Sequence, residues 1–202
     1  MITPILLAAG ASTRMGRPKA LLDFDGKPCL EIALDAVSGL GGPIVVLGPN
    51  RDEIRSGLRL DGARIAVNDD VASGQLASLK AGLALLPSGA EGFLFYPVDH
   101  PLVSRGEIAR LTAAFHAEPA KSIFVPSHRM RRGHPILCRR PLAEEYASLP
   151  PGSSARAVLD ADPGRISYVL FDEAYILMDM DTPEDYARCL EAYRERERRN
   201  RR

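Results

Sequence analysis

Short apolar runs recur along the chain, and each has the length and composition of a buried strand. Between several of them lie segments whose apolar residues fall on one face of a helix, as Leu76, Leu79 and Leu83 do. Alternating strands and helices are the repeating unit of a doubly wound parallel sheet. We therefore predict an α/β fold with a mostly parallel sheet in three α/β/α layers, with strands over residues 5–8, 43–47, 64–67, 93–96, 122–125 and 166–171.

Polar residues ahead of the helical segments predict where three helices begin. Ser104 with Glu107 fits a capping box that opens a helix to about residue 115. Asn50 with Glu53 fits the same reciprocal arrangement before a short helix to about residue 58. Thr182 precedes a proline and two acidic residues, which is typical of a helix start.

The overall composition is that of an ordinary globular protein without net charge. The chain has 202 residues, of which 26 are Lys or Arg and 26 are Asp or Glu, so no global field favours nucleic acid or a membrane as a partner. The C-terminal end is the exception, because residues 194–202 hold six Arg and two Glu. We predict one domain over residues 1–193 and a basic tail over residues 194–202. We expect this tail to be a solvated helix end rather than a contact for nucleic acid or an acidic partner.

Three cysteines, Cys29, Cys138 and Cys189, lie far apart and form no C-x-x-C pair. Their odd number and the lack of a signal peptide favour a reduced, cytoplasmic protein. No apolar run approaches the roughly 20 residues needed to span a bilayer. We expect each cysteine to be a small core or surface residue.

The most informative stretch follows the first apolar run and reads L-A-A-G-A-S-T-R-M-G-R-P-K over residues 7–19. Its small residues let backbone N–H groups approach oxygen atoms closely, while Arg14 can bind two oxygens with its fork and Lys19 adds a mobile charge. This order of residues suits a triphosphate. It is neither the G-x-G-x-x-G dinucleotide fingerprint nor the G-K-[ST] of a P-loop. The alternative is a glycine-rich turn with solvated basic residues.

The pattern L-A-A-G-x-S-x-R-M-G-x-x-K resembles the signature loop of the nucleotidyltransferases that act on sugar phosphates, isoprenoid precursors and molybdopterin. It is most similar to the molybdopterin cytidylyltransferase-like branch, and further matches extend the resemblance over nearly the whole chain. The resemblance implies a Rossmann-like NTP transferase domain whose loop wraps the nucleotide. It assigns Arg14 and Lys19 to the phosphates as catalytic residues and makes nucleotide contacts of Leu7, Ala8, Ala9, Gly10, Arg14 and Lys19.

A second nucleotide contact is expected at the start of the helical segment after residue 73. Gly74 and Ser78 lie in its first turns, where free N–H groups and a hydroxyl can face a ligand. Taken alone, the Ser78 hydroxyl could equally hydrogen-bond to the backbone of its own helix. The resemblance favours a ligand role, because related enzymes carry a G-x-x-x-S-L segment that holds the base and ribose.

Two carboxylates are candidates for a Mg²⁺ site. Asp99 ends a buried strand, where it could hold Mg²⁺ or merely form a turn before a proline. Asp181 could likewise be only an acidic residue at a helix start. The segments V-D-x-P-L and D-x-D-T-P-E-D match metal-binding segments of the family, so the resemblance assigns Asp99 and Asp181 to the metal. We give no role to His100 beside Asp99.

Residues 126–137 form a basic stretch with two histidines and three arginines, which we expect to be a loop. Its G-H-P-x-L ending resembles a family motif that follows the acceptor-binding region, which implies that Gly133 and His134 shape the acceptor side. A metal role for His128 and His134 is not expected, because further ligands are missing nearby.

The implied reaction is attack by an acceptor phosphate on the α-phosphorus of an NTP, with release of pyrophosphate. A phosphate monoester needs no strong base, so catalysis rests on positioning and charge neutralisation, with Mg²⁺ as the cofactor. The sequence has no nucleophile elbow of the G-x-S-x-G type.

Within the resemblance, Ala9 indicates CTP rather than GTP, because its methyl group narrows the space for a base; UTP is harder to exclude. The implied partners are an NTP, molybdopterin as acceptor, and a molybdoenzyme or its chaperone. A sugar phosphate is an alternative acceptor, although many such enzymes carry an extra C-terminal domain. A nucleotide-binding regulatory module is the non-enzyme alternative, against which Lys19, Asp99 and Asp181 argue.

Overall fold

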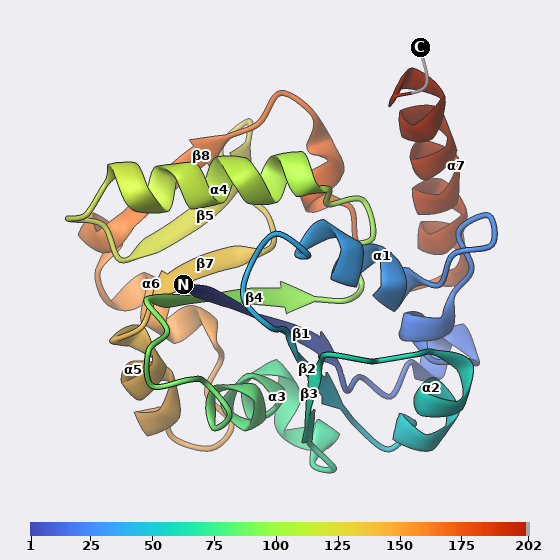
Figure 1. Cartoon of the computed structure of the whole chain (residues 1–202), viewed down its shortest axis with the longest axis horizontal. Helices are drawn as coiled ribbons and strands as arrows, with labels where there is room; N and C mark the ends of the chain where they lie inside the picture. The colour runs from blue at the N-terminus through green and yellow to red at the C-terminus, as the bar shows by residue number, and fades with distance from the viewer. Residues whose placement is uncertain (201–202) are drawn as a thin grey trace.

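A computed structural model describes residues 1–200, in which eight strands form a single mixed sheet (Figure 1). The order across the sheet is β3-β2-β1-β4-β7-β5-β6, and β8 pairs with β5. The strands are β1 (Ile2–Ala8), β2 (Ile44–Leu47), β3 (Arg64–Val67), β4 (Gly92–Pro97), β5 (Ile123–His128), β6 (Arg131–Arg132), β7 (Ile136–Arg139) and β8 (Ile166–Leu170).

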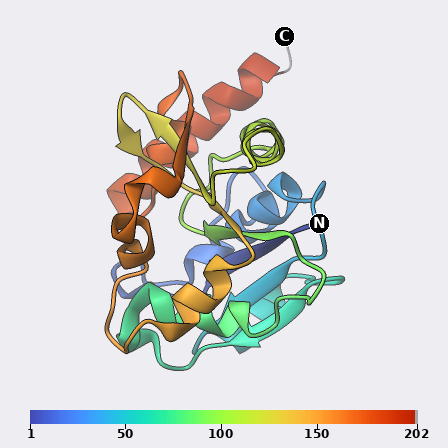
Figure 2. The same cartoon turned by 90° about the vertical axis from the view of Figure 1, so that its left-hand side faces the viewer.

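Helices cover both faces of this sheet, as Figure 2 shows with α4 seen along its axis. One apolar cluster joins the sheet to α1 (Cys29–Ala36), α2 (Arg51–Gly57), α4 (Arg105–Ala117) and α7 (Pro183–Asn200). The other joins it to α3 (Gly74–Leu83), α5 (Leu142–Ser148) and α6 (Arg156–Ala161). Alternate side chains of β1 enter opposite clusters, as a buried strand between two layers requires. The predicted doubly wound, three-layer fold is confirmed.

The two halves of the sheet differ in strand direction. β3, β2, β1 and β4 are all parallel, as predicted. β7 runs antiparallel to both β4 and β5, and β6 forms a hairpin with β5. The expectation of a loop over residues 126–137 is therefore wrong. β6 has only two residues, both Arg, and β7 begins directly after the basic cluster, so the local pattern shows no long apolar run.

All three helices begin where predicted, directly after Asn50, Ser104 and Thr182, but the predicted side-chain cap forms at only two of them. At α4, the Ser104 hydroxyl accepts a hydrogen bond from Gly106 N (3.2 Å) and Glu107 accepts one from Ser104 N (2.9 Å). At α7, the Thr182 hydroxyl accepts a hydrogen bond from Asp185 N (3.2 Å), and Thr182 N donates to the Asp185 carboxylate (2.9 Å). The predicted cap at Asn50 is wrong, since its side chain makes no capping bond. Its φ of −86° and ψ of 15° depart from the extended backbone of an N-cap.

Helix α7 passes through residue 193 without interruption and docks against the domain. Arg194 pairs with Asp25 (2.5 Å), and Arg196 pairs with the partly buried Glu107 (2.7 Å). The division of the chain at residue 193 stays a prediction, and the last two residues of the expected tail, 201–202, lie outside the described residues.

All three cysteines are free and buried, so they are core residues rather than surface ones. Within residues 1–200, no helix combines the length and the apolar character that crossing a bilayer demands.

Candidate active site

A cavity of about 310 Å³ opens at the carboxyl ends of β1 and β4, where ligands bind in doubly wound sheets. We call it the loop cavity, because residues 7–14 form much of its wall. It brings together every residue that the sequence assigned to the nucleotide or the metal: Leu7, Ala8, Ala9, Gly10, Arg14, Lys19, Gly74, Ser78, Asp99 and Asp181.

Small residues and one side-chain hydrogen bond determine the shape of the loop. Ser12 adopts a left-handed backbone (φ 52°), and its hydroxyl accepts a hydrogen bond from Lys19 N (3.1 Å). Ala9 is buried against the end of β2, where a Cβ on Gly48 would lie 2.3 Å from the Ala9 carbonyl oxygen. Because Gly48 has no side chain, the start of the loop can lie directly against the end of β2.

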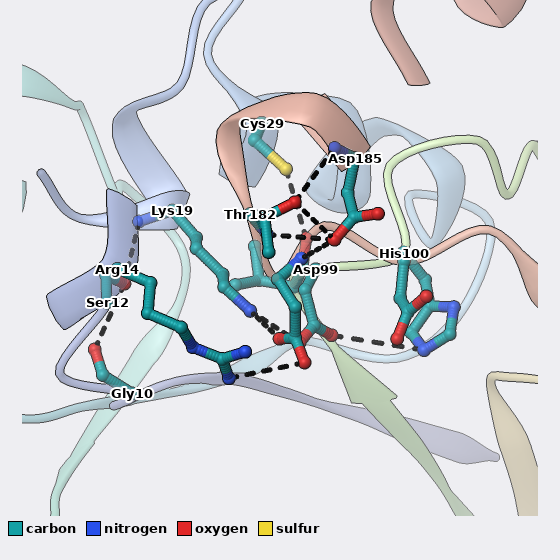
Figure 3. A network of polar contacts seen from close by, with 12 residues as sticks. Gly10, Ser12, Arg14, Lys19, Cys29, Asp99, His100, Thr182 and Asp185 are labelled. Atoms are coloured by element: carbon teal, nitrogen blue, oxygen red, sulfur yellow. Dashed lines mark hydrogen bonds and ion pairs between the residues drawn. The ribbon is translucent and has the colours of Figure 1, made fainter. Parts of the chain in front are cut away.

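Lys19 lies at the centre of the charged groups in the loop cavity (Figure 3). Its Nζ is 2.7 Å from Asp181 Oδ1 and 3.1 Å from Asp99 Oδ2, and its side chain is only 16% exposed. Arg14 reaches the same cluster from the rim: its Nη2 is 3.4 Å from Asp181 Oδ2, and its side chain is 67% exposed. The loop, the end of β4 and the start of α7 thus meet at one point.

The charges of this cluster support each other. Burial lowers the pKa of Lys19, but the charges and hydrogen bonds of Asp99 and Asp181 outweigh burial and raise it overall. The hydrogen bond from Lys19 lowers the pKa of Asp181 below its usual range, and the charge of Lys19 adds to the effect. Lys19 and Asp181 are therefore both ionised at neutral pH.

The carboxylates have the donor chemistry that a hard cation requires. Asp99 Oδ1 is buried and has no hydrogen-bond partner within residues 1–200, and Asp99 and Asp181 already share one cationic group. The described residues contain no group of three or more His, Cys, Asp or Glu side chains arranged for a metal. Two carboxylates suit Mg²⁺, which keeps several waters and takes further oxygens from phosphates.

Ser78 is held by a buried residue that the sequence interpretation missed. Its hydroxyl accepts a hydrogen bond from Asn68 Nδ2 (2.9 Å), and Asn68 Oδ1 accepts one from Asp70 N (3.1 Å). Asn68 follows β3 directly, so its place at the carboxyl end of a predicted strand was an available signal. Gly74 begins α3 with φ 78°, which an L side chain rarely adopts.

The histidines form a packed group beside the carboxylates. The rings of His100 and His134 lie 4.6 Å apart between centroids, and His100 Nε2 is 3.9 Å from Asp99 Oδ1. Burial lowers the pKa of His100, and burial lowers that of His134 to about 3. His128 lies apart from them, with Nδ1 2.9 Å from the Phe171 carbonyl oxygen.

A second cavity, of about 700 Å³, lies next to the first. We call it the hairpin cavity, because Met130, Arg131 and Arg132 of the β5–β6 hairpin line it. Gln75 lines both cavities, a position that the sequence interpretation also missed. The hairpin cavity includes Gly133 and His134, whose expected acceptor role stays a prediction.

Known proteins resemble this chain over nearly its full length. Nicotine blue oxidoreductase of Paenarthrobacter nicotinovorans is 32% identical over 197 residues, covering 94% of this chain and 96% of that protein. Molybdenum cofactor cytidylyltransferase of Escherichia coli (strain K12) is 26% identical over 198 residues, covering 95% and 96%.

Solved structures agree with this result. Rv0371c from Mycobacterium tuberculosis H37Rv superposes with a TM-score of 0.82 at 32% identity, over 94% of this chain and 97% of that one. A second structure of Rv0371c, in complex with manganese, has a TM-score of 0.78 at 30% identity over 95% and 98%. The model of the MobA-like NTP transferase domain matches residues 4–166. The chain therefore belongs to the MobA-like NTP transferase family.

Proposed function

We propose that this protein is a Mg²⁺-dependent cytidylyltransferase that moves CMP from CTP onto the phosphate of molybdopterin or its molybdenum cofactor and releases pyrophosphate. One observation carries the proposal: Lys19 bridges Asp99 and Asp181 in a cavity walled by the signature loop. A cation-binding carboxylate pair beside a phosphate-binding loop is what transfer from a triphosphate needs.

The chain's own groups would act by binding and charge neutralisation. Lys19 and Arg14 would hold the β- and γ-phosphates and stabilise the charge that develops on pyrophosphate as it leaves. The acceptor phosphate is itself the nucleophile, so no side chain must take a proton from it. A bound Mg²⁺ would add orientation and polarisation of the triphosphate, and Asp99 and Asp181 would hold it.

Two features support CTP as the donor. Ala9 is buried and lines the loop cavity, and its methyl group would crowd the space that a purine needs. Ser78, oriented by Asn68, presents a hydroxyl to the same cavity and would read the edge of cytosine together with loop backbone groups. The relative from Escherichia coli is named for cytidylyl transfer.

The acceptor would occupy the hairpin cavity, which adjoins the loop cavity at Gln75. A sugar phosphate or another small phosphate is the alternative acceptor. A molybdoenzyme or its chaperone would then receive the product, in the cytoplasm. The non-enzyme alternative is a regulatory module that only binds the nucleotide.

An oxidoreductase is a second candidate, because a relative at 32% identity carries that name. Electron transfer would leave the bridging position of Lys19 between two carboxylates without a use, which favours the transferase. The two activities give different products and can be separated in one assay.

The deciding experiment incubates the protein with Mg²⁺, each of the four NTPs, and either molybdopterin or a panel of sugar phosphates. We expect pyrophosphate release with CTP and molybdopterin, and a CMP adduct by mass spectrometry. Release with a sugar phosphate alone would replace the acceptor. CTP binding without any release would indicate the regulatory module. A parallel incubation with a reduced nicotinamide and a dye as electron acceptor tests the other candidate, and reduction of the dye without pyrophosphate release in the first incubation would indicate the oxidoreductase.

A further inference from the structure

The tip of the β5–β6 hairpin has an unfavourable backbone for its sequence. His128 pairs with Arg131, so Arg129 and Met130 are the two central residues of the turn. Both have positive φ, 48° and 63°. Two-residue turns with positive φ at both central positions favour Asn-Gly or Gly-Gly, because other side chains are strained there. The turn's own geometry therefore does not account for Arg-Met.

Packing does not account for Met130 either. Its side chain is 85% exposed, more than any other large hydrophobic residue within residues 1–200. Two features of Met130 are therefore unfavourable: its backbone is strained, and its apolar side chain is exposed to solvent. Strain of this kind persists where the residue serves a site.

The hairpin tip stands at the wall of the hairpin cavity. Met130 and Arg131 line it on one side, while Phe95, Ile136 and Tyr168 supply apolar and aromatic surface. Met is well suited to such a wall, since its flexible thioether makes favourable contacts with aromatic rings. The cavity thus has an apolar side chain at its edge and aromatic side chains in its wall, and both could pack on a ligand with a flat ring.

The same wall carries positive charge. Arg132 and Arg156 share one carboxylate, Asp160, at 3.2 Å each, and Arg132 also donates to the Tyr168 hydroxyl (3.1 Å). Arg131 has no carboxylate within 4.0 Å among residues 1–200. Three arginines with one shared carboxylate leave the cavity electropositive, and Arg131 is the group free to pair with an anion.

We propose that Met130 and Arg131 are specificity-determining residues that select a planar-ring anion as the acceptor, Met130 packing on the ring and Arg131 pairing with an anionic group. This inference rests on the proposed function and names the substrate class that it would use. Gln75 marks the junction through which the acceptor phosphate would meet the nucleotide. A sugar phosphate has no flat unsaturated face and would gain little from Met130.

The test compares Met130→Gln, Met130→Leu and Arg131→Gln with the unchanged protein. With molybdopterin as acceptor, Met130→Gln and Arg131→Gln should each raise the acceptor KM about 10-fold, the effect expected when a buried apolar contact or a charged pair is lost. The KM for CTP and kcat should stay within about twofold, and Met130→Leu should restore most of the affinity. Leu170→Gln is the matched control: it also replaces an exposed apolar residue (62%), on β8 and outside the cavity lining.

A second variant separates function from folding. Arg129→Asn combined with Met130→Gly gives the turn its favoured residues, so the thermal midpoint should rise. The acceptor KM should nevertheless rise about 10-fold. A more stable protein with weaker acceptor binding would show that the strained tip serves the ligand. An unchanged acceptor KM in this variant and in Met130→Gln would overturn the inference and leave the proposed function intact.

Direct binding keeps the inference testable if no transfer occurs. A fluorescent pterin monophosphate titrated into the nucleotide-free protein should bind the unchanged chain about 10-fold more tightly than Met130→Gln, and glucose 1-phosphate should not distinguish the two. That result would support the inference even without pyrophosphate release. Equal binding of the pterin by both proteins, or tighter binding of the sugar phosphate, would overturn it.

Discussion

The parallel half of the sheet and the mixed half present two different kinds of cavity. In the parallel half, the wall of the loop cavity comes largely from one continuous stretch, residues 7–14, and its central charges are paired. In the mixed half, the wall of the hairpin cavity comes from α3, β4, β5, β6, β7, α6 and β8, and Arg131 pairs with no carboxylate among residues 1–200. Under the proposed function, the loop cavity would hold a triphosphate with its cation, and the hairpin cavity would hold the acceptor anion.

This contrast indicates how the fold divides its work. The loop that would bind the nucleotide is a single local segment. The wall that would bind the acceptor is assembled from elements far apart in sequence, so a change in any one of them could alter the acceptor without altering the nucleotide site. Three changes in the loop cavity should lower activity or selectivity by decreasing factors, and one change in the mixed half should alter stability in acid.

Removing the negative charges of Asp99 and Asp181 should lower activity more than any other change. Asp99→Asn and Asp181→Asn should each lower kcat/KM about 10³-fold, because loss of metal-assisted charge stabilisation is worth several kcal/mol. The double variant should fall far short of the product of the two effects if both hold one ion. Mn²⁺ binding, followed by electron paramagnetic resonance, should weaken in parallel. Asp52→Asn, at an exposed site on α2, is the control, and full activity of the double variant would make the carboxylates structural.

Lys19→Ala should have the next largest effect. We expect kcat/KM to fall about 10²-fold, roughly 2.7 kcal/mol of transition-state stabilisation, while the protein stays folded. The matched control is Lys121→Ala in the mixed half, whose Nζ contacts only the Gly164 carbonyl oxygen among the bonds described. Near-normal turnover of a folded Lys19→Ala protein would refute the proposed role of the loop in binding phosphates.

The choice of base should respond to Ala9. The unchanged protein should prefer CTP to GTP in kcat/KM, and Ala9→Gly should reduce that preference by about 10-fold, because one methyl group less leaves more room for a purine. Acceptor KM should not change, since Ala9 does not line the hairpin cavity. The measurement is kcat/KM for CTP, UTP, GTP and ATP with one acceptor. A clear preference of the unchanged protein for GTP would contradict the prediction.

The last prediction concerns stability in acid rather than activity, and it belongs to the mixed half. Burial lowers the pKa of His134 to about 3, against about 6.5 in an unfolded chain. Between these values the unfolded chain binds a proton that the folded chain does not, so stability falls as pH falls below about 6.5. The slope is at most roughly 1.4 kcal/mol per pH unit for this group. Urea unfolding of His134→Phe should show a shallower decline between pH 6.5 and 4, and an unchanged slope would refute this account.

Much of the fold could be predicted because its parallel half is built from local patterns. The apolar runs behind β1, β2 and β4 are short and buried, and helical segments separate them from one another and from the edge strand β3. The mixed half resisted prediction, because β6 has two residues and its partners are set by tertiary pairing rather than by periodicity. Asn50 failed as a cap for the opposite reason: its residue type was suitable, but its backbone was not.

The candidate site divides in the same way. The loop residues were found from one motif, and the structure brings Lys19, Asp99 and Asp181 together as a single cluster. Their roles remain predictions. Gln75 and Met130 were missed, because their places in a cavity wall depend on elements distant in sequence. Asn68 was missed although it directly follows a predicted strand. A side chain that acts through a cavity wall leaves little local signal.

The meeting of Lys19 with Asp181 also bears on how the protein is made. The two residues are 162 positions apart, yet their side-chain atoms lie 2.7 Å from each other. A ribosome delivers the N-terminal segments first, so the loop and its parallel strands can assemble while Asp181 has not yet been synthesised. Until then Lys19 has only Asp99 as an acidic partner. Nucleotidyl transfer by the proposed cluster would therefore be confined to chains whose synthesis has passed the start of α7, and unfinished chains would be kept from consuming nucleotide.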